Sequence, residues 1–311
     1  MVRSAYLAIL VSVFIVSIAA SDSLKWDATH RTLRSDKINV RFPYRGSGII
    51  FWHGDEPETE FRLDVVEIKE FLDENHNNVF DSGDVACSMV KFSGASWNVN
   101  ANRVYHQGVH GYEVIISTEL EVRRGQSIGY GGRRDFARIR LSNYVFEENV
   151  TFNGEKLIGL RDMLIRIYIN GWPWSNENSK ILIVFGYGYE GRLGKQQRHY
   201  RRTEDTCQIK VRGGGSKYMD IKVGAVSNVD GDTVESNISV TDNTFSISIP
   251  AHGNDLSFDM VISIMEISEA IRFTKTDLMV CTATISVICI ITAVRTYMAR
   301  RRIHDLRSYI E

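Results

Sequence analysis

The 311-residue sequence has little net charge, few cysteines, and neither an internal repeat nor a low-complexity linker. Its formal net charge is -1 at pH 7, so no global field favours nucleic acid or an anionic membrane surface as a partner. It contains only four cysteines, which argues against the small disulfide-rich modules of many receptors. Few windows show the apolar periodicity of a helix, so a helical domain is not expected.

One long apolar run is present, from Leu278 to Val294, with the sequence LMVCTATISVICIITAV. Seventeen helical residues span about 25 Å, the short end of what a bilayer core requires. Asp277 precedes the run, and four arginines follow it: Arg295, Arg300, Arg301 and Arg302. Arginine collects on the cytoplasmic side, so we expect a transmembrane helix over 277–295 and a cytoplasmic tail over 296–311. A buried core helix would not explain arginines at one end only.

The N-terminus agrees with export of the upstream residues. Arg3 precedes an apolar stretch from Ala5 to Ile18 that is short for a membrane span, and small residues follow at 19–21. We therefore expect residues 1–21 to be a removed signal peptide. The mature chain is then a single-pass type I membrane protein in the plasma membrane or a secretory-pathway membrane. Its exoplasmic part, residues 22–276, is long enough for one large β domain or two smaller ones.

Two cysteines, Cys87 and Cys207, lie in the exoplasmic part, where an oxidising environment favours a disulfide. A bridge closing a loop of about 120 residues would stabilise the fold by about 4–5 kcal/mol in the loop-entropy model. Two free thiols or a covalent dimer remain alternatives. Two N-glycosylation sequons are also exoplasmic, at Asn149 and Asn237.

Between Trp26 and about Ile271, short segments rich in Val, Ile, Tyr and Phe alternate with Gly, Asn and Asp clusters. The expected strands include 37–42, 112–122, 137–144, 163–169, 181–187, 218–223 and 243–249. Asp230-Gly231 is a hairpin-turn signal. We predict an all-β, sandwich-type ectodomain, either one composite unit or two packed sandwiches, with halves at 22–155 and 156–276. The basic, glycine-rich stretch 191–215 is expected to be a long exposed loop.

A twelve-residue segment, DENHNNVFDSGD at 73–84, places an oxygen-bearing side chain at nearly every second position. It matches the pattern D-x-[DN]-x-[DN]-G except at its last position and resembles the calcium loops of EF-hands and dockerin-type modules. Calcium takes six to eight oxygen ligands, which such a tight loop can supply. The resemblance implies these ligands: Asp73, Asn75, Asn77, the Val79 carbonyl, Asp81 and Asp84. It also implies that Phe80 points into the core.

The loop departs from the calcium pattern at two positions. Asn78 replaces the glycine, although Asn tolerates a left-handed φ. Asp84 replaces the usual Glu, and its shorter side chain makes bidentate coordination harder. The flanking residues favour strands over the helices of an EF-hand, so we expect a calcium-binding loop between two strands. A solvated Asx-rich turn without a metal is the alternative.

Three further groups of residues invite a function. The aromatic residues Trp172 and Trp174 would serve as a ligand platform if exposed, or otherwise belong to the core. The basic residues Arg198, Arg201 and Arg202 suit a processing site, an anion-binding patch or merely a solvated loop. In the apolar run, Thr282 and Ser286 form a small-xxx-small pair that suggests a homodimer.

Two formal enzyme motifs lack the helix that their chemistry requires. The GxSxG at 125–129 is followed by more glycines, and the GxGxxG at 186–191 follows a strand but precedes a basic, glycine-rich stretch. We therefore do not expect an enzyme. We expect a calcium-stabilised, membrane-anchored module for adhesion, reception or surface binding, with a protein or glycan partner and no nucleic acid. An accessory or trafficking subunit of the secretory pathway is the alternative, and a membrane-anchored hydrolase comes third.

Overall fold

The computed structural model describes residues 24–266, except 55, 125–134, 153–155, 191–196, 204–205, 214–215 and 251. The expected signal peptide, transmembrane helix and cytoplasmic tail lie outside this part, as do the two cysteines of the apolar run, Cys281 and Cys289. Within the described residues, no helix has the length and apolar character needed to cross a membrane.

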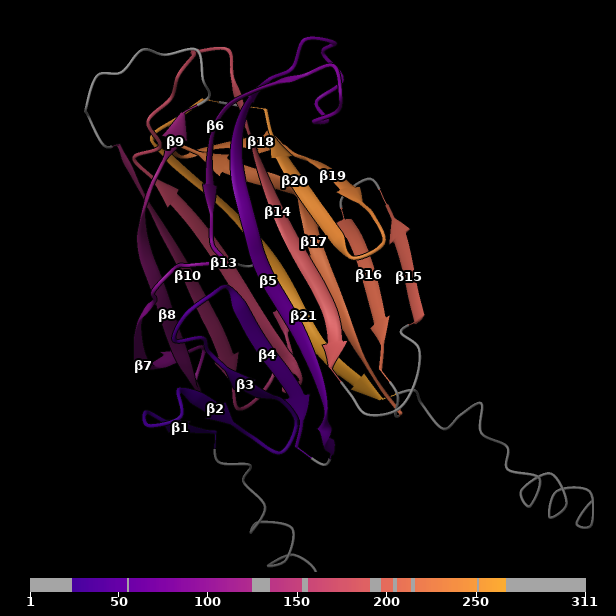
Figure 1. Cartoon of the computed structure of the whole chain (residues 1–311). Coiled ribbons are helices and arrows are strands. Elements are labelled where there is room, and N and C mark those ends of the chain that lie inside the picture. Colours follow the sequence, from indigo (N-terminus) through magenta and orange to yellow (C-terminus); the bar gives the residue numbers. More distant parts are fainter. Residues whose placement is uncertain are drawn as a thin grey trace, which may run out of the picture. The chain divides into compact units, whose positions relative to one another are not determined.

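The described strands form two large antiparallel sheets and one small hairpin (Figure 1). The first sheet has the order β1 (Lys25–Asp27), β2 (Thr32–Arg34), β3 (Asn39–Arg41), β4 (Gly48–His53), β5 (Glu56–Leu72), β14 (Lys180–Glu190), β20 (Thr244–Ile249), β19 (Asn237–Val240). Strand β6 (Val85–Lys91) pairs with the second half of β5 and with β9 (Arg123–Arg124). The all-β, sandwich-type prediction is confirmed at this level.

The second sheet has the order β15 (Gln197–Arg202), β16 (Thr206–Arg212), β17 (Lys217–Val229), β21 (Asp255–Glu266), β13 (Asp162–Asn170), β10 (Phe136–Phe146), β8 (Val109–Glu121), β7 (Asn98–His106). Strand β18 (Asp232–Glu235) pairs with β17 through a tight turn in which Asp230 and Gly231 both have positive φ, as the Asp-Gly signal predicts. Each sheet combines strands from before and after residue 155.

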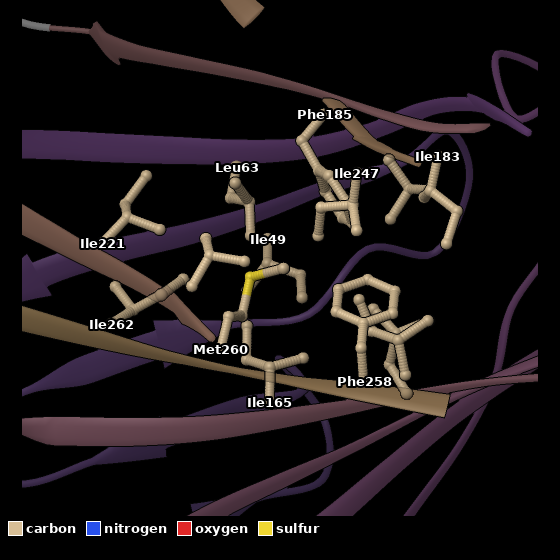
Figure 2. Packing of buried hydrophobic residues seen from close by; sticks show 14 of the residues in the cluster. Ile49, Leu63, Ile165, Ile183, Phe185, Ile221, Ile247, Phe258, Met260 and Ile262 are labelled. Carbon is tan, nitrogen blue, oxygen red and sulfur yellow. The ribbon is translucent and has the colours of Figure 1, made fainter. Parts of the chain in front are cut away.

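Period-two alternation explains why these segments form strands with one buried face. Along β21, for example, Leu256, Phe258, Met260, Ile262 and Ile264 are all buried. Figure 2 shows the meeting of the two inner faces, where apolar side chains of the first sheet point toward those of the second. The labelled residues there are Ile49, Leu63, Ile183, Phe185 and Ile247 from the first sheet and Ile165, Ile221, Phe258, Met260 and Ile262 from the second.

A smaller apolar cluster lies on the outer face of the second sheet. The hairpin of β11 (Val150–Phe152) and β12 (Lys156–Ile158) contributes Val150 and Ile158, which pack with Phe146 of β10 and Leu164 of β13. The hairpin therefore covers part of a sheet face that would otherwise expose apolar side chains.

The stretch 191–215 contains two strands where sequence analysis expects one long loop. In β16, Cys207, Ile209 and Val211 are buried at every second position. Strand β15 pairs with β16 along its whole length, from Gln197 opposite Arg212 to Arg202 opposite Cys207. The loop prediction is wrong because backbone pairing with β16 places a polar, basic segment in a strand.

Candidate functional site

The residues with the calcium-loop pattern connect β5 to β6 and project beyond the end of β5, at the top of Figure 1. Phe71, near the end of β5, is opposite Lys180 of β14, whereas Ile68, three residues earlier, and Ile181, next to Lys180, belong to the main core. Phe71 therefore points to the outer face, where its ring meets that of Phe80 at 5.4 Å, edge to face. Strands flank the loop, as expected. Phe80 packs outside the main core, which corrects its expected direction.

Two residues of the loop adopt the left-handed conformation, His76 with φ 58° and Asn78 with φ 61°. Asn78 occupies the glycine position of the pattern, and its φ is the one that the pattern requires there. The turn brings two backbone N–H groups onto the Asp73 carboxylate: Asn77 N donates to Oδ1 at 3.2 Å and Asn78 N to Oδ2 at 2.8 Å. The loop thus wraps its first carboxylate.

The other candidate ligands converge on one another. Asp81 Oδ2 accepts from the side-chain amides of Asn75 and Asn77, each at 2.9 Å. Asp84 accepts from the backbone N–H groups of Glu74 at 3.1 Å and Asp81 at 2.8 Å. Hydrogen bonds from the Gly83 N–H, and then from the two amides, lower the pKa of Asp81 below its ordinary value. The predicted residues are therefore together, and their oxygen atoms accept hydrogen bonds within the loop.

A lysine from a distant strand completes this arrangement. Lys180, the first residue of β14, places Nζ 2.5 Å from Asp73 Oδ2 and 2.5 Å from Asn78 Oδ1. The Asp73 side chain is only 1% exposed. Burial alone would raise the pKa of Asp73, but the hydrogen bonds from Lys180 and Asn78 outweigh it and leave the pKa below its ordinary value. Sequence reasoning missed Lys180, which lies more than a hundred residues along the chain.

Among the described residues, no group of three or more His, Cys, Asp or Glu side chains is arranged to hold a metal ion. Calcium at this loop would therefore depend on the Asn75 and Asn77 side-chain oxygens and the Val79 carbonyl as well as on carboxylates. It would also have to displace the Lys180 ammonium from Asp73, because that ammonium already neutralises the buried carboxylate.

Glu70, two residues before the end of β5, is a buried carboxylate beside the loop. It accepts four hydrogen bonds and thereby ties β5 to β6 and to the connection between β13 and β14. The donors are Ser88 Oγ at 2.5 Å, Ser175 N at 2.6 Å, Asn176 N at 3.2 Å and Ser179 Oγ at 2.6 Å. Burial raises the pKa of Glu70, but these donors outweigh it and lower the pKa. No local sequence signal marked Glu70.

The tryptophans of the same connection do not form an exposed platform. Trp172 belongs to the main core at 3% exposure, and Trp174 is half-buried with Nε1 donating to the Gly253 carbonyl at 2.7 Å. The centroid of the Trp174 ring also lies 4.4 Å from that of His252, with the two rings tilted by 39°. The core alternative therefore describes both residues better than a ligand platform does.

The expected disulfide between Cys87 and Cys207 is absent, and both thiols are free. Cys87 lies in β6 of the first sheet, and Cys207 in β16 of the second, on strands well separated in Figure 1. Cys207 points into the core, whereas the Cys87 thiol lies 3.7 Å from the Val85 carbonyl of its own strand. Burial raises the pKa of both thiols, so each is held in its protonated form. Within one chain, the two thiols therefore do not pair with each other.

The sequons and the basic residues occupy surface positions. Asn149 is exposed just before β11, and Asn237 begins the edge strand β19. Arg202 of β15 reaches across to β19, where Nη2 donates to Asn237 Oδ1 at 3.2 Å. Arg201 is exposed, and Arg198 lies in the same strand.

An open groove of about 280 Å³ lies between the edges of the two sheets. Its lining residues are Tyr187, His199, Tyr200, Ile209, Val240, Thr241 and Asp242.

Comparison with known proteins adds no relationship to these observations. No protein-family model matches the chain, and no curated protein matches it.

Proposed function

We propose that the chain is a single-pass type I membrane glycoprotein whose β-sandwich ectodomain binds a protein or glycan on the exoplasmic side. Calcium binding by the loop between β5 and β6 would set the geometry of that end of the sandwich. Support for the membrane topology comes from the sequence, through the apolar run, the arginines that follow it and the signal-like N-terminus.

The observation that carries the calcium proposal is a single loop that holds two hydrogen-bonded carboxylates, Asp73 and Asp81, and already has a cation on the first of them. Asp73 and Asp81 lie on one loop whose Asn78 has the left-handed φ of a cation-wrapping turn. A positive charge at Asp73 is already part of the fold, since Lys180 contacts it at 2.5 Å. Calcium would supply a larger charge at the same place and would bring the two carboxylates onto one ion.

The membrane topology is testable on intact cells that express the full chain with a C-terminal tag. A membrane-impermeant biotin reagent should label the ectodomain, and the tag should resist external protease. Protection of the ectodomain together with digestion of the tag would contradict the topology. If the ectodomain is not labelled and the tag is not digested on intact cells, the result would instead indicate that the chain lies in an internal membrane.

The binding role is testable by adhesion of the same cells to other cells or to glycan-coated surfaces, with calcium or a chelator. We expect adhesion that calcium supports and that Asp73→Ala with Asp81→Ala abolishes. The matched control is Asp232→Ala with Glu235→Ala, which removes the same charge from exposed positions on β18. Equal loss in both double variants would point to a general charge effect and contradict the loop's role.

The accessory-subunit alternative has one observation in its favour. Strand β21 ends at Glu266, about ten residues before the apolar run, and a short link of this kind suits a partner anchored in the same membrane. Retention inside the cell, with stoichiometric co-purification of one membrane protein, would favour this alternative over a surface binding module.

A further inference from the structure

The edge strand β7 differs from the other terminal strands of the two sheets. Edge strands carry unpaired backbone groups, and proteins usually guard them by shortness or by charge. Strands β1 and β19 have three and four residues, and β15 carries three arginines in six residues. Strand β7 has nine residues, NVNANRVYH, with Arg103 as its one Lys, Arg, Asp or Glu. Within the described residues, β7 pairs only with β8, and it lies at the left of Figure 1.

The orientation of the backbone groups on β7 follows from its neighbours. Glu147 N donates to the His110 carbonyl. The backbone N–H and C=O groups of the even-numbered residues of β8 therefore point to β10, and those of the odd-numbered residues point to β7. Asn100 lies opposite Ile115, so Asn98, Asn100 and Asn102 direct their backbone groups to β8. The backbone N–H and C=O groups of the residues between them, Val99 and Ala101, therefore point to the free edge.

The side chains of the same segment, Asn-Val-Asn-Ala-Asn over residues 98–102, have a polar/apolar pattern that reads the same in both directions. The three asparagines are exposed on the outer face of the sheet, and their amides have no hydrogen-bond partner among the described residues. Val99 and Ala101 face the interior and are half-buried against the main core. A partner strand with the same pattern would meet amides with amides and apolar side chains with apolar side chains.

We propose that β7 is a dimerisation edge that pairs antiparallel with β7 of a second copy of this chain, about a two-fold axis at Asn100. In this register Asn100 faces its own counterpart, and Asn98 faces Asn102 of the other copy. An amide both donates and accepts, so each asparagine pair is self-complementary. Val99 faces Ala101 of the other copy, and their outward backbone groups complete the ladder.

Charge and symmetry favour a second copy as the occupant. A two-fold interface must be complementary to itself, and the segment meets this requirement because asparagine faces asparagine and an apolar residue faces an apolar residue. No charged residue falls within the paired segment 98–102, so the two copies do not repel each other there. The opposite edge, β15, would place arginines of two copies near one another, which is unfavourable. This dimer is independent of calcium and of the apolar run.

The register makes a sharp prediction for cysteine cross-linking of the full-length chain in detergent. Residues facing each other in a non-hydrogen-bonded antiparallel pair have Cα atoms about 4.5 Å apart, within the range of a disulfide. Asn100→Cys should therefore form a covalent dimer under mild oxidation. Asn98→Cys and Asn102→Cys, each alone, should not, because each faces a different residue. A mixture of these two variants should form the cross-linked heterodimer.

A second variant tests the dimer without cross-linking. Asn100→Lys keeps an exposed side chain on the monomer but places two ammonium groups opposite each other in the dimer. We expect the wild-type chain to sediment as a dimer and Asn100→Lys as a monomer, with unchanged melting of the fold. Equal cross-linking of all three cysteine variants, no cross-linking of Asn100→Cys, or a wild-type monomer would each overturn the proposal. So would a dimer that persists in Asn100→Lys.

Discussion

Replacing Lys180 with methionine removes the cation beside the buried Asp73 while keeping most of the apolar stem. Breaking a fully buried ion pair costs about 3–5 kcal/mol, because one charge is left unpaired. Here Asp73 keeps two backbone donors, Asn77 and Asn78, and the Lys180 side chain is 16% exposed, so water can reach the gap. We therefore expect Lys180→Met to lower the free energy of unfolding by about 1–3 kcal/mol in the presence of a chelator.

Calcium should reverse much of this loss. A ligand at a hundred times its Kd stabilises the folded state by about 2.7 kcal/mol. In the wild-type chain calcium must first displace the Lys180 ammonium, whereas in Lys180→Met that competition is gone. The rise in Tm on adding calcium should therefore be larger in Lys180→Met than in the wild type.

Thermal unfolding of the purified protein, with chelator and with saturating calcium, measures both effects. At about 2–4 °C per kcal/mol for a domain of this size, the expected shifts are well resolved. Lys222→Met is the matched control, because Lys222 is exposed on the other sheet and the charge change is the same. An unchanged Tm of Lys180→Met in chelator would refute the structural role of the ion pair. A calcium response no larger than that of the wild type would refute the competition.

Three further outcomes follow from single residues and can be checked separately. Glu70→Gln should cost about 1–3 kcal/mol near neutral pH by urea unfolding. Because folding lowers the Glu70 pKa, the wild-type advantage is complete above about pH 4.3 and is lost as the pH falls through the folded-state pKa. An advantage that grows on acidification would contradict this. Gly111→Ala should cost about 1–3 kcal/mol, because its Cβ would lie 2.5 Å from the Val145 carbonyl oxygen. Gly188→Ala, with no atom within 4 Å of the new Cβ, should instead gain about 0.5–1 kcal/mol. Equal changes in the free energy of unfolding for Gly111→Ala and Gly188→Ala would show that backbone entropy, and not the close contact with Val145, determines both. Asn149→Gln should remove one glycan, seen as faster migration that glycosidase treatment of the wild type reproduces. A wild type unaffected by glycosidase would contradict glycosylation.

Much of the strand content was predictable because it rests on local alternation. Segments such as Thr244–Ile249 repeat an apolar residue at every second position, and one buried face follows directly. Strand β15 was missed because QRHYRR shows no such alternation, although its partner β16 does through Cys207, Ile209 and Val211. The pairing of β5 with β14 joins segments more than a hundred residues apart, and no local pattern encodes it.

The candidate site divides in the same way. Asp73, Asn75 and Asp81 were predicted from spacing within twelve residues, and the structure places all three on one hydrogen-bonded loop. Lys180, which neutralises Asp73, enters from a distant strand that pairs with β5, so only the tertiary fold reveals it. The disulfide prediction was wrong for a related reason. It rested on the two cysteines sharing a compartment, whereas a disulfide also requires their strands to lie close together in the fold.

Calorimetric titration of the purified full-length chain with calcium tests the central claim most directly. The proposed function predicts one calcium ion bound per chain, with the binding heat abolished by Asp73→Ala with Asp81→Ala and retained by Asp232→Ala with Glu235→Ala. No binding heat up to millimolar calcium at several temperatures, with no change in Tm, would contradict it. The loop between β5 and β6 would then be a metal-free turn whose cation is Lys180 alone.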